Sequence, residues 1–406
     1  MATVHPFRAL RPAADNANRV SCPPYDVVNT PEARALKGDN ADSFLRVTRP
    51  EIDLPEGTDE HASEVYSKAA ENLAEFVRRG VLAPDAEPHF YVYAQTMGGH
   101  RQVGLVACAS VAEYVADTIK KHEKTRADKE DDRTRHIDTL GSHDEPVFLT
   151  YRSVAVIDAE IRAICAASHV YDFVSPDGVR HEFWVVPTTR SDRIASLFRD
   201  VPALYVADGH HRSAAAMRVN TLRAGRPGEH DRFPAVIFPH DQMQILAYNR
   251  LVRDPRGRSS DELLSRLADI MIVGPGKQPA PDAPKSLGVF LGGRWHSATV
   301  RPGSYDPADP VASLDCSIVQ DQILAPLFGI TDPRRDTHVD FVGGIRGARE
   351  LERRVRDEGW SLALHLHPTR IEELIAVSDA GLLMPPKSTW FEPKLRSGLF
   401  VHAFGE

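Results

Sequence analysis

A glycine and four polar residues stand together where a buried run meets a row of small helix formers. The segment LYVADGHHRSAAA contains them in the order Asp208, Gly209, His210, His211 and Arg212. A glycine lets the backbone approach a ligand closely, and the start of a helix offers unpaired N–H groups and partial positive charge. Histidine and arginine add hydrogen-bond donors. The pattern predicts a phosphate-binding corner; the alternative is a capping aspartate beside solvated histidines.

A second group lies in the strongly charged segment IKKHEKTRADKEDDRTRH, which holds His122 and Glu123 after two lysines. A carboxylate next to a histidine and lysines can stay ionised and still accept a proton, as a general base does. The alternative is a solvated charged face, which such a composition usually forms. Position 126 is Arg126, so the two-histidine spacing of a zinc protease helix is missing, and the segment itself argues against zinc.

The third group closes the chain in AGLLMPPKSTWFEPKLRSGLFVHAF. Pro385 and Pro386 favour an extended, rigid segment. Lys387, Ser388 and Thr389 follow and offer an ammonium group and two hydroxyls, which suit a carboxylate or a phosphate. The alternative is a loop that only docks the tail on the core.

The first group needs a strand before it and a helix after it. The apolar run in PALYVAD predicts a short buried strand, and Ala215, Val219 and Leu222 recur at helical spacing. Gly225 then stands where a helix C-cap is expected. The corner is therefore predicted at the N-terminus of a helix that directly follows a strand.

The rest of the chain predicts a mixed α/β (α+β) fold. Residues 64–79 have an amphipathic helical pattern, and residues 97–100 join two strand-like runs as a hairpin. The stretch RDPRGRSSDE at residues 253–260 is linker-like in composition. We place a domain boundary there, between residues 1–253 and 254–406.

Composition bounds the functional classes. The chain of 406 residues has a formal net charge of −8, which argues against binding nucleic acid through a basic surface. Four cysteines without metal-type spacing indicate reduced thiols in a cytoplasmic protein. No apolar stretch is long enough to span a membrane, and the N-terminus does not resemble a secretory signal.

The three groups together resemble the motifs of the free serine kinase (SerK-like) family, as KKHEKT, ADGHHR and PPKSTWFEP. The family's larger bacterial branch is filed as a domain of unknown function, DUF1015. The resemblance to that branch extends over nearly the whole chain, through HPFRALRP, PPYDVV, DRTRHID and FVGGIRG. It implies a ParB/sulfiredoxin-like nucleotide-binding core with mixed sheets and insertions in residues 1–253. A smaller C-terminal α+β domain would supply the substrate-side loop.

The same resemblance implies roles for single residues. Glu123 would be the general base for an acceptor hydroxyl, and Asp208 would lie by the reacting phosphoryl group or bind its Mg²⁺. The nucleotide phosphates would be cradled by Gly209, His210, His211 and Arg212. The substrate side would be formed by His122, Lys387, Ser388 and Thr389.

The function implied is a phosphotransferase that moves a phosphoryl group from ATP or ADP to free L-serine or a related small hydroxyl compound. Alternatives are a phosphatase or nucleotide hydrolase using the same site, a ParB-like nucleotide-binding switch, and a non-catalytic binding protein. The expected partners are a nucleotide and a small hydroxyl amino acid, with no nucleic acid and no membrane, and a homodimer is one possible assembly.

Overall fold

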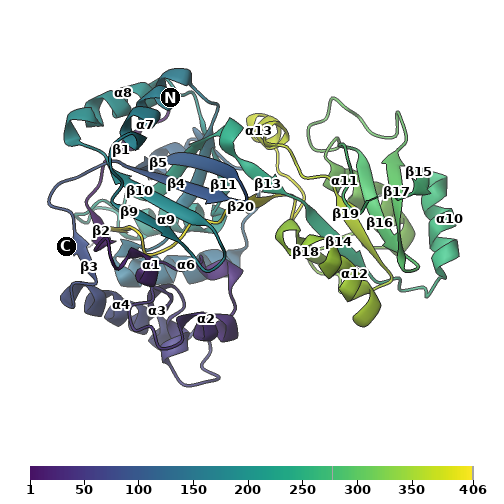
Figure 1. Cartoon of the computed structure of the whole chain (residues 1–406), viewed down its shortest axis with the longest axis horizontal. Helices are drawn as coiled ribbons and strands as arrows, with labels where there is room; N and C mark the ends of the chain where they lie inside the picture. The colour runs from purple at the N-terminus through teal and green to yellow at the C-terminus, as the bar shows by residue number, and fades with distance from the viewer. Residues whose placement is uncertain (277, 405–406) are drawn as a thin grey trace. The chain divides into compact units, whose positions relative to one another are not determined.

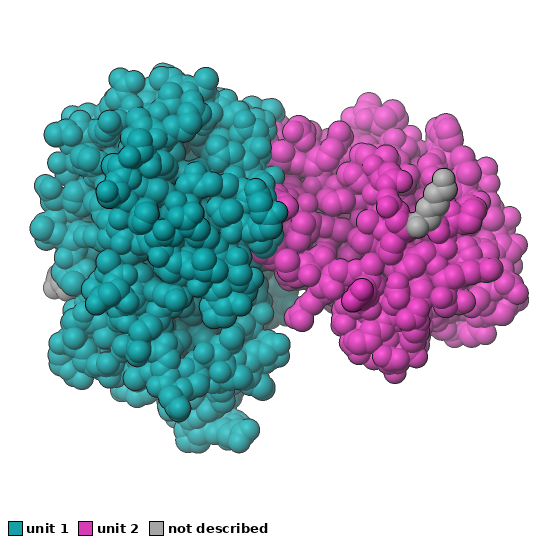
Figure 2. All heavy atoms as spheres, viewed as in Figure 1, with its two compact units in different colours: residues 1–243, 393–406 teal, residues 244–392 magenta. Residues whose placement is uncertain are grey.

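The computed structural model describes residues 1–276 and 278–404, which form two compact units (Figure 1). Unit 1 comprises Met1–Met243 and Pro393–Glu406, and unit 2 comprises Gln244–Glu392 (Figure 2). Both units combine helices with mixed or antiparallel sheets, so the predicted mixed α/β class is confirmed.

The large sheet of unit 1 positions the strand that precedes the corner. Its strand order is β6-β11-β8-β12-β5-β4-β10-β9, with β1 paired to β5. The bounds are β1 Val4–His5, β4 Tyr91–Met97, β5 His100–Ser110, β6 Ile119–Lys120, β8 Val147–Tyr151, β9 Tyr171–Val174, β10 Arg180–Val185, β11 Leu204–Asp208 and β12 Arg232–Pro239. Strand β11 is parallel to β6 and antiparallel to β8, so the sheet is mixed.

Helices cover this sheet through apolar faces at helical spacing. Ile157, Ile161 and Ile164 of α7 and Phe198 of α8 belong to the main core cluster with the sheet residues. The longer helices of unit 1 are α4 Ser63–Arg78, α6 Ala127–Leu140, α7 Ala155–Cys165, α8 Ser191–Arg199 and α9 His210–Leu222. Shorter ones are α1 Ala17–Val20, η1 Tyr25–Val27, α2 Thr30–Lys37, α3 Leu45–Thr48, η2 Pro50–Asp53, α5 Val111–Val115, η3 Thr188–Arg190 and η4 His240–Gln242.

Helices α6 and α9 pack against each other and against the end of the chain. Ile137 of α6, Ala215 and Val219 of α9 and Phe404 form a small buried cluster. The tail is held there because β21 Val401–Ala403 pairs with β2 Ala9–Pro12 and with β7 Ser142–His143, and β3 Leu82–Pro84 completes that sheet. The C-terminal residues thus return to unit 1, next to the helix that follows the corner.

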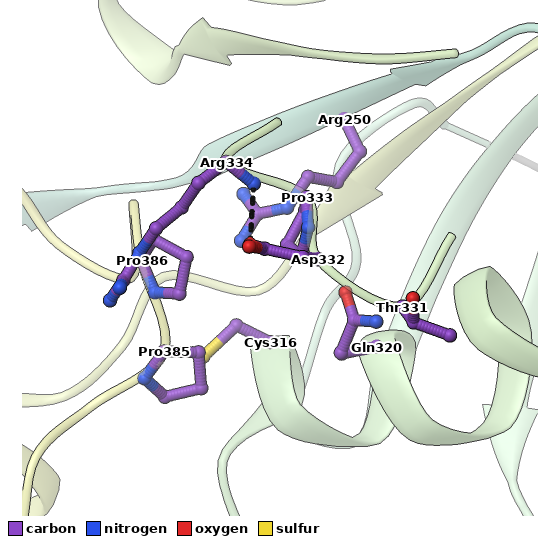
Figure 3. Close-up of a pocket in the computed structure, with 9 residues that line it drawn as sticks. All are labelled: Arg250, Cys316, Gln320, Thr331, Asp332, Pro333, Arg334, Pro385 and Pro386. Atoms are coloured by element: carbon purple, nitrogen blue, oxygen red, sulfur yellow. Dashed lines mark hydrogen bonds between the residues drawn. The ribbon is translucent and has the colours of Figure 1, made fainter. Parts of the chain in front are cut away.

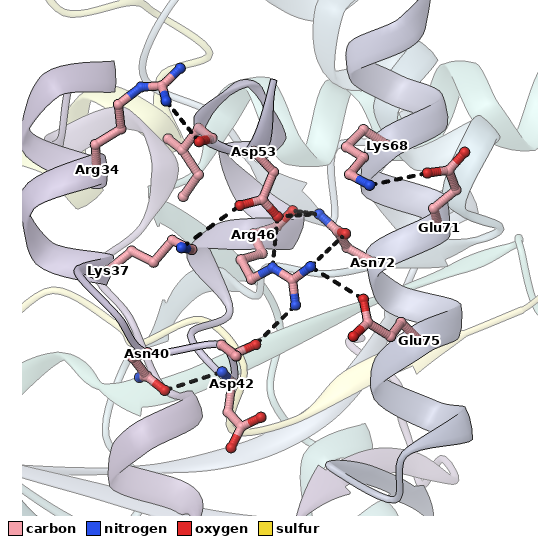
Figure 4. Close-up of polar contacts among 12 residues, drawn as sticks. Arg34, Lys37, Asn40, Asp42, Arg46, Asp53, Lys68, Glu71, Asn72 and Glu75 are labelled. Carbon is pink, nitrogen blue, oxygen red and sulfur yellow. Dashed lines mark hydrogen bonds and ion pairs between the residues drawn. The ribbon is translucent and has the colours of Figure 1, made fainter. Parts of the chain in front are cut away.

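A polar network fastens the N-terminal helices to α4 (Figure 4). Arg46 on α3 forms ion pairs with Asp53 at 2.6 Å and with Glu75 of α4 at 3.2 Å. The fully buried Asn72 of α4 donates to the Arg46 carbonyl at 2.7 Å. Because each buried polar group has a partner, this network holds the segment without a large desolvation cost.

Two local predictions are confirmed, and a third is wrong. The helix expected at residues 64–79 is α4, and the hairpin has Met97 paired with His100. The helix after the corner ends at Leu222 with Arg223 as its C-cap, so Gly225 is not the cap. Gly225 instead has φ +80° two residues beyond that cap.

Unit 2 is built on the sheet β15-β17-β16-β19-β14-β18, and a two-strand ribbon joins β13 to β20. The strands are β13 Gln244–Leu246, β14 Tyr248–Val252, β15 Met271–Pro275, β16 Ser286–Leu291, β17 Arg294–Val300, β18 Val339–Gly343, β19 Leu362–Leu366 and β20 Trp390–Glu392. The helices are α10 Ser260–Ile270, α11 Asp315–Val319, η5 Gln320–Phe328, η6 Gly344–Arg346, α12 Gly347–Asp357 and α13 Ile371–Asp379. In the described part of the chain, no helix is long and apolar enough to cross a bilayer.

The structure divides the chain differently from the boundary expected at residues 253–260. That linker-like segment is a loop inside unit 2, between β14 and α10, where Asp254 forms a 2.8 Å ion pair with Arg258 and accepts from its backbone N–H. Pro, Gly and charged residues occur in such a loop as readily as in a linker. Unit 2 begins at Gln244, and the chain leaves it after Glu392.

Candidate active site

The predicted corner lies where β11 ends at Asp208 and α9 begins at His210. Gly209 joins them with φ +94°, a conformation that residues with a Cβ rarely adopt. Within residues 1–276 and 278–404, no side chain caps the start of α9, so its first N–H groups are available to an anion. A Cβ at Gly209 would lie 3.1 Å from the Arg212 Nε, which shows how closely the arginine packs on the turn.

Arg212 is buried beneath this turn and does not extend into solvent. Its guanidinium donates to the Pro146 carbonyl and lies 3.5 Å from Asp208 and 3.9 Å from Asp26. Burial would lower the pKa of Arg212, but the Asp26 and Asp208 carboxylates outweigh that effect and raise it. The Arg212 side chain therefore stays charged, and its contacts with Pro146 and Asp208 hold the corner in place.

Asp208 is paired with a cation that comes from the far end of the sequence. Lys394 Nζ lies 2.8 Å from its Oδ2, while Arg212 faces its Oδ1. Burial alone would raise the pKa of Asp208, but Lys394 and Arg212 hold it well below its usual range. Asp208 is thus a carboxylate at neutral pH, and Lys394 brings a second positive charge to the corner.

The segment with His122 and Glu123 reaches the same place because of strand pairing. Strand β6 runs parallel to β11, with Leu204 opposite Ile119 and Tyr205 opposite Lys120. Parallel neighbours end at the same edge of a sheet. The residues after Lys120 therefore emerge beside Asp208, and the Arg126 N–H donates to His211 Nε2 at 3.2 Å.

Three side chains meet at this edge: His122, Glu123 and His210. Their ligand-type atoms all lie within 4.8 Å of one another, and the His210 Nδ1 is 3.9 Å from the Glu123 Oε2. The two imidazole rings make an edge contact, with centroids 4.4 Å apart. Both histidines are buried, whereas the Glu123 side chain is 40% exposed. A ligand from solvent can therefore reach the carboxylate.

The two buried rings are neutral. Burial lowers the pKa of His122 to about 4, and burial with the neighbouring His122 lowers the pKa of His210 well below its ordinary value. Among the residues that the structure describes, neither ring nitrogen of His122 nor the Nε2 of His210 has a hydrogen-bond partner of acceptable geometry. Buried nitrogens without a hydrogen-bond partner cost free energy of folding. Such groups are typical of a site where a protein binds a ligand or an ion.

We expect the neutral His122 to make the protein sensitive to acid. The pKa of His122 in the folded protein, about 4, lies below the ordinary histidine value of 6.5. The unfolded chain therefore binds the proton first, and stability falls as the pH decreases from 6.5 towards 4. This group contributes up to about 3 kcal/mol to that loss. Urea unfolding across this window should give a shallower pH dependence for His122→Gln, and identical slopes would contradict the account.

The donor chemistry of the cluster suits some metals better than others. Two neutral imidazoles and one carboxylate are ligands for zinc or ferrous iron. Mg²⁺ prefers oxygen ligands, so the imidazoles do not fit it. Asp208, the ligand expected for Mg²⁺, faces Lys394 and Arg212 instead, so the residues present do not form a magnesium site of their own.

Glu145 is a buried carboxylate near Arg212 that the sequence did not indicate. Glu145 accepts from the Tyr25 N–H and from the Ser397 hydroxyl, both at 2.9 Å. Burial raises its pKa to about 7. None of Asp26, Glu145 and Lys394 was predicted as a site residue. Asp26 lies within PPYDVV and Lys394 directly follows PPKSTWFEP, and the family resemblance of these two segments was the available signal.

The predicted loop Lys387–Thr389 belongs to unit 2, whereas the corner belongs to unit 1. The buried Ser388 donates its hydroxyl to the Pro385 carbonyl at 2.6 Å, and Thr369 donates to the Ser388 carbonyl. Lys387 is exposed and has φ +59°, a left-handed conformation. Ser388 thus stabilises the loop, and Lys387 and Thr389 keep accessible surface.

Comparison with solved structures finds matches at low sequence identity and low TM-score. A free serine kinase variant in complex with ADP is 13% identical, over 68% of this chain and 84% of that chain, with a TM-score of 0.35. A conserved hypothetical protein from Pyrococcus furiosus is 12% identical, over 71% and 93%, with a TM-score of 0.36. C-terminally truncated SbnI from Staphylococcus aureus is 12% identical, over 73% and 87%, with a TM-score of 0.40.

The comparison with curated proteins finds no match. The profile of the family described as "Protein of unknown function (DUF1015)" matches residues 4–317. That match contains both the Glu123 segment and the corner at Asp208. Because it extends over most of the sequence, the chain belongs to the DUF1015 family.

Proposed function

We propose that the protein is a small-molecule kinase that transfers a phosphoryl group from ATP or ADP to a small hydroxyl compound. The acceptor proposed is free L-serine, which would give O-phospho-L-serine. The observation that carries the proposal is the exposed Glu123 carboxylate 3.9 Å from His210, the first residue of α9. A carboxylate that could accept a proton and a helix start that could bind phosphate thus lie at one edge of the sheet, which supports the proposal.

The donor phosphates would lie at the start of α9. The first backbone N–H groups of that helix and its dipole favour negative charge, and Gly209 leaves room for close approach. Neutral His210 and His211 would act as hydrogen-bond donors rather than as cations. Arg212, buried and bonded to Pro146, is a positioning residue that keeps the turn in shape.

Glu123 would take the proton from the acceptor hydroxyl. The acceptor oxygen then forms a bond to the terminal phosphorus, and the bond from that phosphorus to the bridging oxygen breaks, so the shortened nucleotide leaves with the electron pair. Phosphoryl transfer asks a protein chiefly for positioning and charge neutralisation. The Lys394 ammonium beside Asp208 adds positive charge at the corner.

Mg²⁺ is proposed as a partner of the nucleotide rather than as a resident ion. Its usual ligands in such complexes are phosphate oxygens, carboxylates and water. We derive no step from a metal bound at Asp208, because that carboxylate already faces two cations. On the acceptor side, His122, Lys387 and Thr389 stay proposals, and Ser388 would act by holding its loop.

A second candidate is a metal-dependent phosphatase or nucleotide hydrolase. The cluster of His122, Glu123 and His210 favours it, because two imidazoles and a carboxylate can hold an ion that activates water. In that case Glu123 would be a metal ligand and not the base. Metal analysis of the purified protein separates the two, since the hydrolase requires about one equivalent of a transition metal and the kinase requires none.

Phosphorus NMR of reaction mixtures tests the proposal. The protein would be incubated with Mg²⁺, ATP or ADP, and a panel of hydroxyl amino acids. The kinase predicts a new phosphomonoester resonance that depends on both donor and acceptor. Inorganic phosphate alone, with or without the acceptor, would identify a hydrolase. Phosphoserine incubated with and without ADP or AMP is the matched reverse reaction: a kinase that uses ATP as donor consumes it only with ADP, and one that uses ADP as donor consumes it only with AMP.

A further inference from the structure

Unit 2 contains a cavity of about 220 Å³ that the proposed reaction does not use (Figure 3). Its walls come from separate parts of unit 2. Arg250 enters from β14, Cys316 and Gln320 from the helical segment that begins with α11, and Pro385 and Pro386 from the loop before β20. The remaining wall is the loop of residues 331–334.

Arg250 is the feature of this cavity that most needs explanation. The residue is 3% exposed, and its guanidinium donates to the Tyr248 carbonyl at 2.5 Å and to the Lys387 carbonyl at 3.1 Å. Its charge also lies 4.6 Å from the Phe341 ring centroid. The groups that favour its charge are the Cys316 thiol and the Tyr248 hydroxyl, and no carboxylate of the described residues is among them. Burial lowers the pKa of Arg250 to about 10.

An unpaired buried guanidinium costs free energy that the fold must supply. Two carbonyls accept from it, whereas a guanidinium has five N–H donors in a planar fork. That fork matches the two oxygens of a carboxylate or phosphate. A hydrophobic side chain of similar size would fill the space at lower cost if packing were the only need. The Arg250 guanidinium therefore lacks the anionic partner that its donors would bind best.

The other walls of the cavity agree with a small ligand. Arg334 extends along the cavity towards Pro386 in Figure 3 and supplies a second positive charge. Thr331 and Gln320 offer polar groups. The volume is below the range typical of drug-sized ligand pockets, so the occupant has few heavy atoms. Asp332 also lines the cavity and gives an acceptor for a donor group on the ligand.

We propose that the cavity around Arg250 and Arg334 binds a small anionic molecule through its carboxylate or phosphoryl group. Arg250 would bind the anion through its planar guanidinium. Arg334, in the loop of residues 331–334, would add a second positive charge next to it. None of the residues that line the cavity has a role in the proposed kinase reaction, so this proposal does not rest on the kinase assignment. Arg250 also holds the carbonyl of the left-handed Lys387, so occupancy would act on the PPKST loop.

Titration calorimetry of the full chain tests this site, with inorganic phosphate and malonate as separate probes at constant ionic strength. We expect saturable binding of at least one probe, and the better probe identifies the class of anion. Arg334→Gln should weaken that binding at least about threefold. Arg335→Gln removes a charge from the same loop, but its 90% exposed side chain does not line the cavity and makes only a surface ion pair with Asp332 at 3.9 Å, so it should weaken binding far less than Arg334→Gln.

Two further variants keep the test decisive. Arg250→Lys preserves the charge but loses the planar fork, so it should weaken binding by tenfold or more while the chain stays folded. Asp332→Asn removes a like charge and should strengthen the binding of phosphate or malonate. Phosphate can also bind at the start of α9, so each variant is repeated in a Gly209→Ala background. The proposal fails if neither probe binds saturably, or if Arg334→Gln and Arg335→Gln behave alike.

Discussion

Replacement of Glu123 by glutamine is expected to lower turnover by about 10²–10⁴-fold while nucleotide affinity changes little. The amide is nearly the same size and keeps the contact with His210, but it does not accept a proton at neutral pH. The nucleotide is bound by backbone groups of α9 in this account, and those are unaffected by the change. Steady-state rates and a nucleotide titration measure the two effects separately.

The matched control is Asp131→Asn. Asp131 is 61% exposed, lies a short distance along the same charged segment and pairs with Arg218 on α9. Its replacement removes the same charge without touching the cluster, so turnover should stay near that of the wild type. Full turnover in Glu123→Gln would show that this carboxylate is not the base. Joint loss of turnover and of a bound transition metal would favour the hydrolase.

Gly209→Ala is expected to weaken nucleotide binding by tenfold or more, which corresponds to about 1.4 kcal/mol. A residue with a Cβ at φ +94° is strained, by about 1–3 kcal/mol. The new methyl group would also lie 3.1–3.2 Å from the Arg212 guanidinium, which is fixed by Pro146 and Asp208. The turn and the first N–H groups of α9 must therefore shift.

Gly225→Ala separates backbone strain from damage to the site. Gly225 has φ +80°, and a Cβ there meets nothing within 4 Å. This variant should lose similar stability in urea unfolding and yet bind nucleotide normally. If both variants weaken binding equally, the loss arises from general destabilisation, and the role assigned to the corner is wrong.

The local parts of this site could be predicted from the sequence. The run PALYVAD, the following glycine and the spacing of Ala215 and Val219 predict a strand, a turn and a helix, and these are β11, Gly209 and α9. Such patterns are read from near neighbours, whose periodicity reports the local secondary structure. The α4 helix and the Met97–His100 hairpin were predictable for the same reason.

The long-range parts could not be predicted in this way. Strand β6 is only Ile119–Lys120, too short to leave a periodic pattern, yet its parallel pairing with β11 brings Glu123 to the corner. The zinc-protease spacing would place the second histidine at residue 126, whereas the second histidine near Glu123 is His210, from another element. Lys394 reaches Asp208 because the tail folds back through β21. Each contact depends on tertiary packing, which no local pattern encodes.

The central claim is that the start of α9 binds the donor phosphates while Glu123 faces the phosphoryl group to be transferred. A crystal structure of the Glu123→Gln variant with ADP and L-serine tests it most directly. The account predicts phosphate oxygens within hydrogen-bond distance of the backbone N–H groups of His210–Arg212, with residue 123 beside the acceptor hydroxyl. Nucleotide bound elsewhere in the chain, with the start of α9 facing only solvent, would contradict it.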